Sequence, residues 1–154
     1  MLTIVLYEPQ IPPNTGNIGR LCAATETTLH IVGNIGFDLT DKKMKRAGLD
    51  YWKHIDYKYF PDLDHYHQQM VKTNRFHLLT TKSQYTYTSK QFMRNDYLIF
   101  GSETTGINDN ILISHWGSTC TIPMKNPNIR SLNLANSVSI VLFEALRQIN
   151  ENKS

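Results

Sequence analysis

The chain has 154 residues, of which 40% are hydrophobic and 19% charged, and its formal net charge at pH 7 is +3. This length predicts one domain over residues 1–154, and no apolar run approaches the roughly 20 residues that cross a bilayer. The mild positive charge is compatible with a nucleic-acid partner but does not indicate one. Because the first residues lack the pattern of a secretory signal, we expect a cytoplasmic protein with reduced, buried thiols at Cys22 and Cys120.

Apolar runs bounded by turn residues recur along the chain and alternate with helical patterns. The predicted strands are 2–7, 29–33, 75–81, 96–101 and 119–124, with 54–60 as a further candidate that places Ile55, Tyr57 and Tyr59 on one face. The predicted helices are 15–27, 41–47, 62–73, 108–114 and 132–150. Continuous apolar strands are typical of a parallel sheet that is covered on both faces. The pattern therefore predicts an α/β fold, a mostly parallel sheet flanked by helices.

The first predicted helix lies in "PPNTGNIGRLCAAT", residues 12–25. The segment contains neither the G-x-G-x-x-G pattern of a dinucleotide-binding fold nor a P-loop. We expect Asn14 or Thr15 to cap the helix and the glycines to permit close packing. Neither role explains Arg20, which we expect to face the region of the strand ends. Cys22 lies among apolar residues and is expected to be a core thiol.

The segment "DKKMKRAG" places four basic residues within five positions, at Lys42, Lys43, Lys45 and Arg46. Such a run is either a solvated helix face or an anion-binding surface, and the sequence leaves both open. Trp52 and Trp116 are expected to be packing residues, although base stacking beside the basic run is an alternative for Tyr51 and Trp52.

The predicted helix 62–73 carries His65 and His67, with Asp62 and Asp64 beside them. These are metal-ligand residue types. However, a spacing of two does not place both histidines on one face of a helix, and we expect an exposed, charged helix without a metal site.

The segment "LIFGSETTGI", residues 98–107, is a predicted strand followed by a polar loop between Gly101 and Gly106. Ligands of open α/β sheets bind beyond the carboxyl ends of strands, so this loop is a candidate binding site. Glu103 is either a general base or an acceptor of N–H bonds within its own loop, and we favour the second interpretation.

The segment "IPMKNPNIRSLNLANSVSIVLFEA", residues 122–145, leads from a strand into the last helix. Ser131, Asn133, Asn136 and Ser137 are more polar residues than capping requires, which indicates a ligand surface. The helix itself is apolar on two sides. One stripe comprises Leu134, Val138, Val141, Leu142, Ala145, Leu146 and Ile149, whereas Ile140 and Phe143 lie opposite. We therefore expect a dimer interface through this helix.

Together, residues 12–25, 96–107 and 122–145 resemble the three motifs of SPOUT-class RNA 2′-O-methyltransferases. With "KRAGLDYW" (45–52) and "LLTTK" (78–82), the pattern is most similar to the family of minimal tRNA (cytidine/uridine-34) 2′-O-methyltransferases, over nearly the whole chain. The resemblance implies a C-terminal deep trefoil knot, a homodimer, and methyl transfer from S-adenosylmethionine to the wobble ribose of tRNA, in leucine isoacceptors by analogy. It implies no metal.

The resemblance also assigns residues. The cofactor pocket would include Leu79, Gly101, Ile122 and Ser131. Arg20 would lie beside the transferred methyl group, across the subunit boundary, with Asn133 orienting the site. Because a guanidinium keeps its proton, we expect Arg20 to bind a phosphate rather than act as a base. The residues expected to contact the anticodon stem-loop are Lys42, Lys43, Lys45, Arg46 and Arg130.

The chain departs from the family pattern at two positions. Phe143 stands where some close members have tyrosine, so a hydroxyl contact to RNA is absent there, and Ala135 stands where serine is frequent. The alternatives are methylation at another tRNA or rRNA site, or a non-catalytic RNA-binding dimer of the same fold. An oxidoreductase is disfavoured because the dinucleotide fingerprint is missing.

Overall fold

The computed structural model describes residues 1–47 and 49–153, and its strands form one six-stranded sheet in the order β3-β2-β1-β5-β4-β6. The strands are β1 (Thr3–Tyr7), β2 (Thr28–Val32), β3 (Tyr57–Phe60), β4 (Phe76–Leu79), β5 (Tyr97–Phe100) and β6 (Thr119–Cys120). Every neighbouring pair of strands is parallel. The predicted parallel α/β fold is confirmed. The chain builds outward from β1 in both directions, and such a reversal leaves a crevice at the carboxyl ends of the strands.

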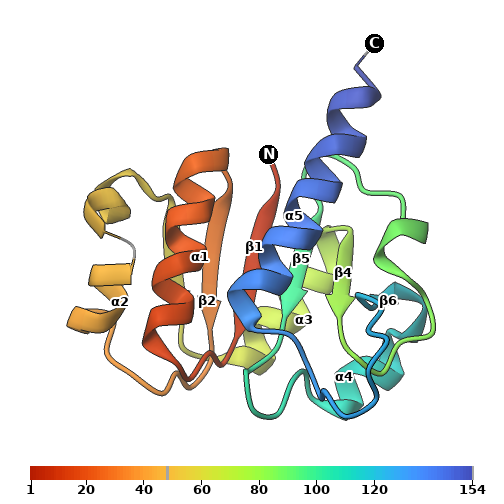
Figure 1. The fold of residues 1–154 in the computed structure, drawn as a ribbon, viewed down its shortest axis with the longest axis horizontal. Helices are drawn as coiled ribbons and strands as arrows, with labels where there is room; N and C mark the ends of the chain where they lie inside the picture. The colour runs from red at the N-terminus through yellow and green to blue at the C-terminus, as the bar shows by residue number, and fades with distance from the viewer. Residues whose placement is uncertain (48, 154) are drawn as a thin grey trace.

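Helices cover both faces of the sheet (Figure 1). On one face lie α1 (Pro12–Thr25) and α5 (Leu134–Glu151), side by side; the other face carries α3 (Leu63–Thr73) and α4 (Asp109–Ser114). The strands contribute alternate side chains to two cores: Ile4 and Leu6 pack on the α1 and α5 side, and Val5 packs on the α3 side. This two-sided burial explains why the strands read as continuous apolar runs.

Helix α1 begins earlier than its sequence pattern predicts. It starts at Pro12, its N-cap is Ile11, and the cap makes no side-chain hydrogen bond. The prediction that Asn14 or Thr15 caps this helix is therefore wrong. Proline fits the first turn of a helix because the N–H that it lacks would have no partner there. Two prolines thus start the helix three residues before its predicted first residue, 15.

Other boundaries also differ from the predictions. Strand β6 has only two residues, so Ile122 and Met124 belong to a loop rather than to a strand. In β3, Tyr57 and Tyr59 share a face and are each 40% exposed, whereas Ile55 precedes the strand. The described residues also contain short 3-10 helices that were not predicted: η1 (Leu49–His54), which reaches into the predicted strand 54–60 at His54, η2 (Tyr87–Ser89) and η3 (Trp116–Ser118).

The glycines of α1 are packing positions, as predicted. A Cβ atom at Gly16 would collide with the carbonyl oxygen of Met44 in α2 (Lys42–Ala47). At Gly19 it would lie 2.9 Å from Ile55 and 3.0 Å from the ring of Trp52. Both tryptophans pack against the cores, as expected. The missing side chains therefore let α2 and η1 rest directly on α1.

The predicted buried thiols are confirmed. Cys22 and Cys120 are free and buried, and burial raises the pKa of each thiol to about 12.

The expectation that α3 is an exposed, charged helix is wrong in part. His67 is buried, its Nδ1 lies 2.8 Å from the hydroxyl of Tyr7, and burial lowers its pKa. Asp62 instead caps α3 by accepting the N–H of His65 at 3.0 Å.

The last helix, α5, is apolar on two sides, as predicted. Its inner stripe is buried from Leu134 to Ala145 and partly buried at Leu146 and Ile149, whereas Ile140 is 37% exposed and Phe143 is 55% exposed on the outside. Among the described residues, no helix has both the length and the apolar character needed to cross a membrane.

Candidate functional site

A cavity of about 820 Å³ lies at the carboxyl ends of the central strands. The loop after β4, the loop after β5 and the segment between β6 and α5 form its walls. These segments meet at the lower edge of the molecule in Figure 1. The volume is within the range of small-molecule and cofactor sites, and the position is where a parallel sheet places its ligands.

All the residues predicted to hold a cofactor line this cavity, namely Leu79, Gly101, Ile122 and Ser131. Leu79 and Ile122 are half-buried against the core and form apolar walls. Ser131 is exposed at the rim. A Cβ atom at Gly101 would collide with the backbone of Gly106 and Ile107. The absence of a side chain at Gly101 is therefore required by its own loop, a reason that the sequence did not indicate.

Glu103 binds a different loop from the one predicted. Its Oε1 accepts the N–H of Gln10 and its Oε2 the N–H of Ile11, both at 2.8 Å. The side chain of Asn14 donates to the same Oε2 at 3.2 Å. The expectation that Glu103 accepts N–H bonds within its own loop is thus wrong. The start of α1 lacks a side-chain cap of its own, and a carboxylate at a helix N-terminus is favoured by the helix dipole.

Asn133 connects the same network to α5. Its Oδ1 caps α5 by accepting the N–H of Asn136 at 3.2 Å, and its Nδ2 donates to Oδ1 of Asn14 at 3.0 Å. Glu103, Asn14 and Asn133 all line the cavity. We call these residues the Asn14 relay, because Asn14 bonds to both of the others. The relay ties together the loops that precede α1, follow β5 and precede α5.

Most of the polar run at the start of α5, which was predicted to form a ligand surface, lies at the cavity. Ser131, Asn133 and Ser137 line it, whereas Asn136 is exposed outside it. Arg130 also lines the cavity and is exposed.

Sequence reasoning missed part of the wall formed by the loop after β4. Thr80, Thr81 and Lys82 line the cavity, and Nζ of Lys82 forms an ion pair with Asp109 at 2.6 Å. Their place directly after a buried strand was the available signal, because that is where a parallel sheet presents polar groups to a ligand.

The structure does not bring Arg20 to the cavity of its own subunit. Arg20 lies on the outer side of α1, is exposed, and its Cζ is 5.7 Å from the ring centroid of Tyr51. The expectation that Arg20 faces the strand ends is therefore wrong within one subunit. The reason is that Arg20 lies more than two turns from the start of α1, well away from the loops that form the site.

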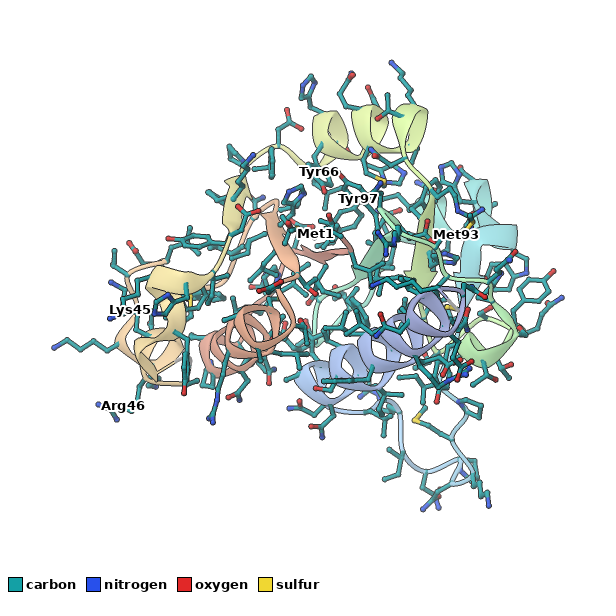
Figure 2. All side chains as sticks on the ribbon, turned by 90° about the horizontal axis from the view of Figure 1, so that it is seen from above. Met1, Lys45, Arg46, Tyr66, Met93 and Tyr97 are labelled. Carbon is teal, nitrogen blue, oxygen red and sulfur yellow. The ribbon has the colours of Figure 1, made fainter. Side chains whose placement is uncertain are left out.

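The basic residues of α2 are also separate from the cavity. Lys42, Lys43, Lys45 and Arg46 are all exposed. Figure 2 shows Lys45 and Arg46 on the side of α1 that faces away from α5. The predicted cofactor residues, Asn133 and Arg130 thus lie together at the cavity. Arg20 and the four basic residues of α2 lie away from it.

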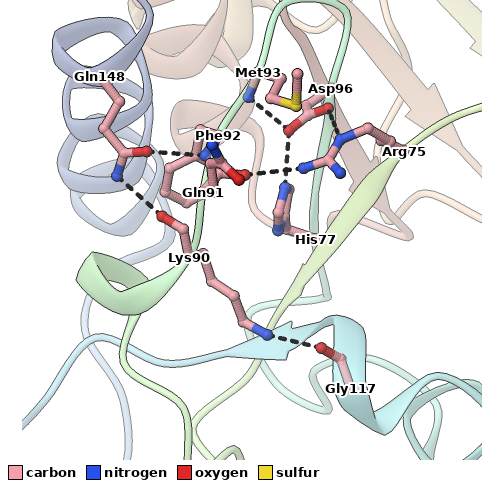
Figure 3. A network of polar contacts seen from close by, with 9 residues as sticks. All are labelled: Arg75, His77, Lys90, Gln91, Phe92, Met93, Asp96, Gly117 and Gln148. Carbon is pink, nitrogen blue, oxygen red and sulfur yellow. Dashed lines mark hydrogen bonds and ion pairs between the residues drawn. The ribbon is translucent and has the colours of Figure 1, made fainter.

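A second polar network lies outside the cavity and centres on Asp96, which precedes β5 (Figure 3). Asp96 is 0% exposed and accepts hydrogen bonds from Nε of Arg75 at 3.0 Å and from the N–H of Met93 at 2.9 Å; Nε2 of His77 lies 2.9 Å away. Burial on its own would raise the pKa of Asp96. The hydrogen bonds from His77, Met93 and Arg75 outweigh burial, and the pKa lies below its usual value.

The same segment is bound to α5. Oε1 of Gln148 accepts the N–H of Phe92 at 2.9 Å, and Nε2 of Gln148 donates to the carbonyl of Lys90 at 3.1 Å (Figure 3). These contacts hold residues 90–96 between the sheet and the last helix, so we assign the Asp96 network to stability.

Comparisons with known proteins agree with this geometry. The model of the SpoU rRNA Methylase family matches residues 1–143. A tRNA (cytidine(34)-2′-O)-methyltransferase of Yersinia pestis is 44% identical over 154 residues, with 97% of this chain and 94% of the relative covered. A proposed tRNA (cytidine(34)-2′-O)-methyltransferase of Geobacillus stearothermophilus is 43% identical over 150 residues, covering 96% of this chain and 94% of the relative.

Solved structures show the same fold. One, described as giving structural insights into the 2-OH methylation of C/U34 on tRNA, superposes with a TM-score of 0.90 at 38% identity, covering 96% of this chain and 95% of that one. The SpoU methyltransferase AviRb of Streptomyces viridochromogenes, in complex with its cofactor AdoMet, superposes with a TM-score of 0.80 at 24% identity, covering 96% and 60%. The second likeness supports the fold alone.

Proposed function

This chain belongs to the SpoU rRNA methylase family, and from this membership we propose that it methylates the ribose 2′-OH of nucleotide 34 in tRNA, with S-adenosylmethionine as donor. The observation that carries the proposal is the near-complete coverage of relatives named for cytidine 34 of tRNA. The proposal treats residues 1–154 as one methyltransferase domain that acts in the cytoplasm, on cytidine or modified uridine in leucine tRNAs.

The cavity fits this cofactor. Leu79 and Ile122 provide apolar walls for a planar base, and Gly101 contributes to the lining of the same cavity. Ser131 offers a hydroxyl group at the rim. S-adenosylmethionine supplies a methyl group that its sulfonium already activates. The protein therefore has mainly to align the 2′-oxygen with that methyl group, and the Asn14 relay holds the walls in place for it.

Arg20 acts in this proposal from the partner subunit. The outer faces of α1 and α5 are adjacent, and Ile140 and Phe143 expose apolar side chains there. A symmetric dimer formed through these faces covers both residues and carries Arg20 to the interface. The guanidinium then binds a phosphate of the RNA with its fork of N–H donors and fixes the ribose.

A subunit-mixing experiment tests this placement. Arg20→Ala and Ile122→Arg are each expected to be inactive as homodimers, the first without the guanidinium and the second with a blocked cavity. In the mixed dimer, the open cavity of the Arg20→Ala subunit faces the intact Arg20 of its partner, so activity should return. If mixing restores no activity although both chains co-purify as a dimer, Arg20 does not act across the interface.

The tRNA contacts in this proposal are Lys42, Lys43, Lys45 and Arg46 on α2, with Arg130 at the cavity. Cations that neutralise phosphates release counterions, so binding should weaken steeply with salt. Removing the four charges of α2 should flatten the slope of log Kd against log salt, as measured by filter binding. An unchanged slope would assign these residues to a solvated face.

We also propose the trefoil knot. The N–H of Thr121 donates to the carbonyl of Tyr85, and the N–H of Tyr87 donates to the carbonyl of Thr121. Gln148 binds Lys90 and Phe92. Residues 85–92 are thus bound both by the end of β6 and by α5, as expected where one segment threads a loop. An experimental trace of residues 80–134 tests the threading.

Incubation with labelled S-adenosylmethionine and a set of unmodified tRNAs, followed by mapping of the methylated nucleoside, tests the function. Methylation should occur at nucleotide 34 and disappear when that position carries a 2′-deoxyribose. Transfer to another nucleotide would favour the alternative RNA site, and binding without transfer to any RNA would favour the non-catalytic dimer. Arg20→Ala should abolish most transfer and leave calorimetric binding of the cofactor intact.

A further inference from the structure

The surroundings of Arg20 contain an unassigned aromatic residue. Tyr51 of η1 lies beneath the guanidinium, with the Cζ atom of Arg20 5.7 Å from its ring centroid, within the range of a cation–π interaction. Among the residues that the structure describes, the guanidinium of Arg20 forms no hydrogen bond or ion pair, and the ring of Tyr51 is its interaction partner. Tyr51 is itself 42% exposed and is not part of either core.

The glycines of α1 explain why Tyr51 lies there. Because Gly16 and Gly19 have no side chains, α2 and η1 pack closely on α1. Trp52, the next residue, inserts its ring against Gly19, and its ring centroid lies 5.2 Å from that of Tyr57. The backbone of η1 is thereby anchored on one side by the tryptophan. The adjacent tyrosine, Tyr51, is left at the surface, beneath the guanidinium of Arg20.

This arrangement suits an arginine that must bind a phosphate. A cation held over a ring uses none of its N–H donors, so the whole fork remains available to an anion. A long side chain also loses rotamer freedom when it binds, and a contact that restricts it beforehand reduces this loss. Lys45 and Arg46 are exposed on α2, which packs against α1 and η1, and add further positive charge near this part of the molecule.

We propose that Tyr51 is a positioning residue for Arg20, holding the guanidinium in the orientation in which it receives a phosphate of the RNA substrate. The inference rests on the proposed function for the identity of the anion. The contact between Arg20 and Tyr51 requires an aromatic side chain at position 51. This requirement does not depend on which nucleotide is methylated.

The test compares Tyr51→Leu, which removes the ring, with Tyr51→Phe, which keeps it. An exposed cation–π contact of ordinary strength predicts that Tyr51→Leu lowers kcat/KM for tRNA about two- to five-fold, whereas Tyr51→Phe retains the activity of the parent. Binding of S-adenosylmethionine should not change in either variant. Tyr85→Leu is the matched control, because Tyr85 is also exposed and carries the Nζ of Lys90 at 4.6 Å from its ring. It should leave kcat/KM unaltered.

Two further measurements separate positioning from a general loss of structure. In an Arg20→Ala background, Tyr51→Leu should cause no additional loss, because its effect passes through Arg20. By NMR, the Nε–Hε resonance of Arg20 should move when the ring is removed by Tyr51→Leu and stay in place in Tyr51→Phe. The NMR result does not require turnover, so it remains decisive even if the RNA substrate is not the one proposed.

The opposite results would overturn the inference. These are an Arg20 resonance that does not respond to removal of the ring, a Tyr51→Phe variant as impaired as Tyr51→Leu, or equal losses from Tyr51→Leu with and without Arg20. Absence of methyl transfer by the parent protein would instead contradict the proposed function, and would leave the NMR comparison to decide the role of Tyr51.

Discussion

Glu103 illustrates how one side chain organises the cavity. Its carboxylate satisfies the N–H groups of Gln10 and Ile11, which precede the prolines at the start of α1. Asn14 then links it to Asn133 at the start of α5. Charge-assisted bonds to backbone N–H groups are stronger than neutral ones. The same carboxylate therefore caps the start of α1 and connects the loop after β5 to it, so that two walls of the cavity are held together.

Replacing Glu103 with glutamine should loosen this arrangement. An amide of the same shape turns one accepting oxygen into a donor that faces an N–H group, so at least one of these half-buried or exposed bonds is lost. We expect a loss of about 0.5–1.5 kcal/mol in the free energy of unfolding and weaker binding of S-adenosylmethionine. Urea denaturation and calorimetric titration measure the two effects. Glu26→Gln, at an exposed position, is the control and should alter neither; a Glu103→Gln variant indistinguishable from it would show that the relay is dispensable.

Asp96 should make stability depend on pH. Its pKa lies below the ordinary value of about 3.9 in the folded chain, because the hydrogen bonds from His77, Met93 and Arg75 outweigh the effect of burial. A depressed carboxyl pKa stabilises the folded state above the unfolded value, and this contribution is lost as the pH falls toward the folded value. Denaturation between pH 6 and 3 should show this loss below about pH 4. Asp96→Asn should lower stability at pH 6 and show a smaller further loss at acid pH. A parallel decline in both proteins would assign the acid sensitivity to other groups.

The position of the cavity residues was predictable, but the bonds among them were not. Leu79 ends β4 and Gly101 directly follows β5 in a parallel sheet, so their place at one edge follows from the apolar pattern and topology. Glu103 and Asn14 are 89 residues apart, and Asn14 and Asn133 are 119 apart. Contacts at such separations depend on how loops pack in three dimensions, and no periodicity in the sequence encodes them.

The two glycines of helix α1 allow neighbouring elements to pack closely against it. Its outer flank accepts α2 and η1 at contact distance, and η1 in turn carries Tyr51 to Arg20. The sequence indicated close packing at these glycines but not the partner. The start of the helix was misplaced, since Asn14 resembles a capping residue and is instead used for the cavity.

Gly16→Ala and Gly19→Ala should therefore differ in their effects. At Gly16 a methyl group meets the backbone of α2, which cannot move without displacing the helix, and overpacking of this kind costs about 1–3 kcal/mol or more. At Gly19 it meets side-chain ends of Ile55 and Trp52, which can shift, and alanine recovers about 1 kcal/mol of helix propensity. We expect a clear fall in unfolding free energy for Gly16→Ala and a smaller one for Gly19→Ala. Asn17→Ala, on the exposed side of α1, controls for propensity alone; equal stability of all three variants would contradict the packing assigned to Gly16.

The molecule as a whole separates its proposed functional groups. The cavity lies at the carboxyl edge of the sheet, whereas Arg20 and the cations of α2 lie on the outer side of α1. The sequence predicted the sheet and the two-sided α5, because both follow from local patterns of apolar residues. The proposed knot and the proposed sharing of the site between two subunits do not follow from such patterns, since threading and symmetry leave no local signature. Both expectations came only from the resemblance.

Phe143→Glu tests whether the separated groups are joined by dimerisation. Phe143 is 55% exposed on the outer side of α5, and burial of such a ring contributes about 1.5–3 kcal/mol per copy. Because a symmetric interface contains the residue twice, the variant should raise the dimer dissociation constant on the order of 100-fold or more. Sedimentation analysis measures the mass, and methyl transfer should fall with the dimer fraction. Ile113→Glu is the control, since Ile113 is 74% exposed on α4, on the other face of the sheet, and should leave the dimer intact. A folded Phe143→Glu monomer with full activity would mean that each subunit completes its own site, and Arg20 would then have to reach its own cavity by a rearrangement of α1.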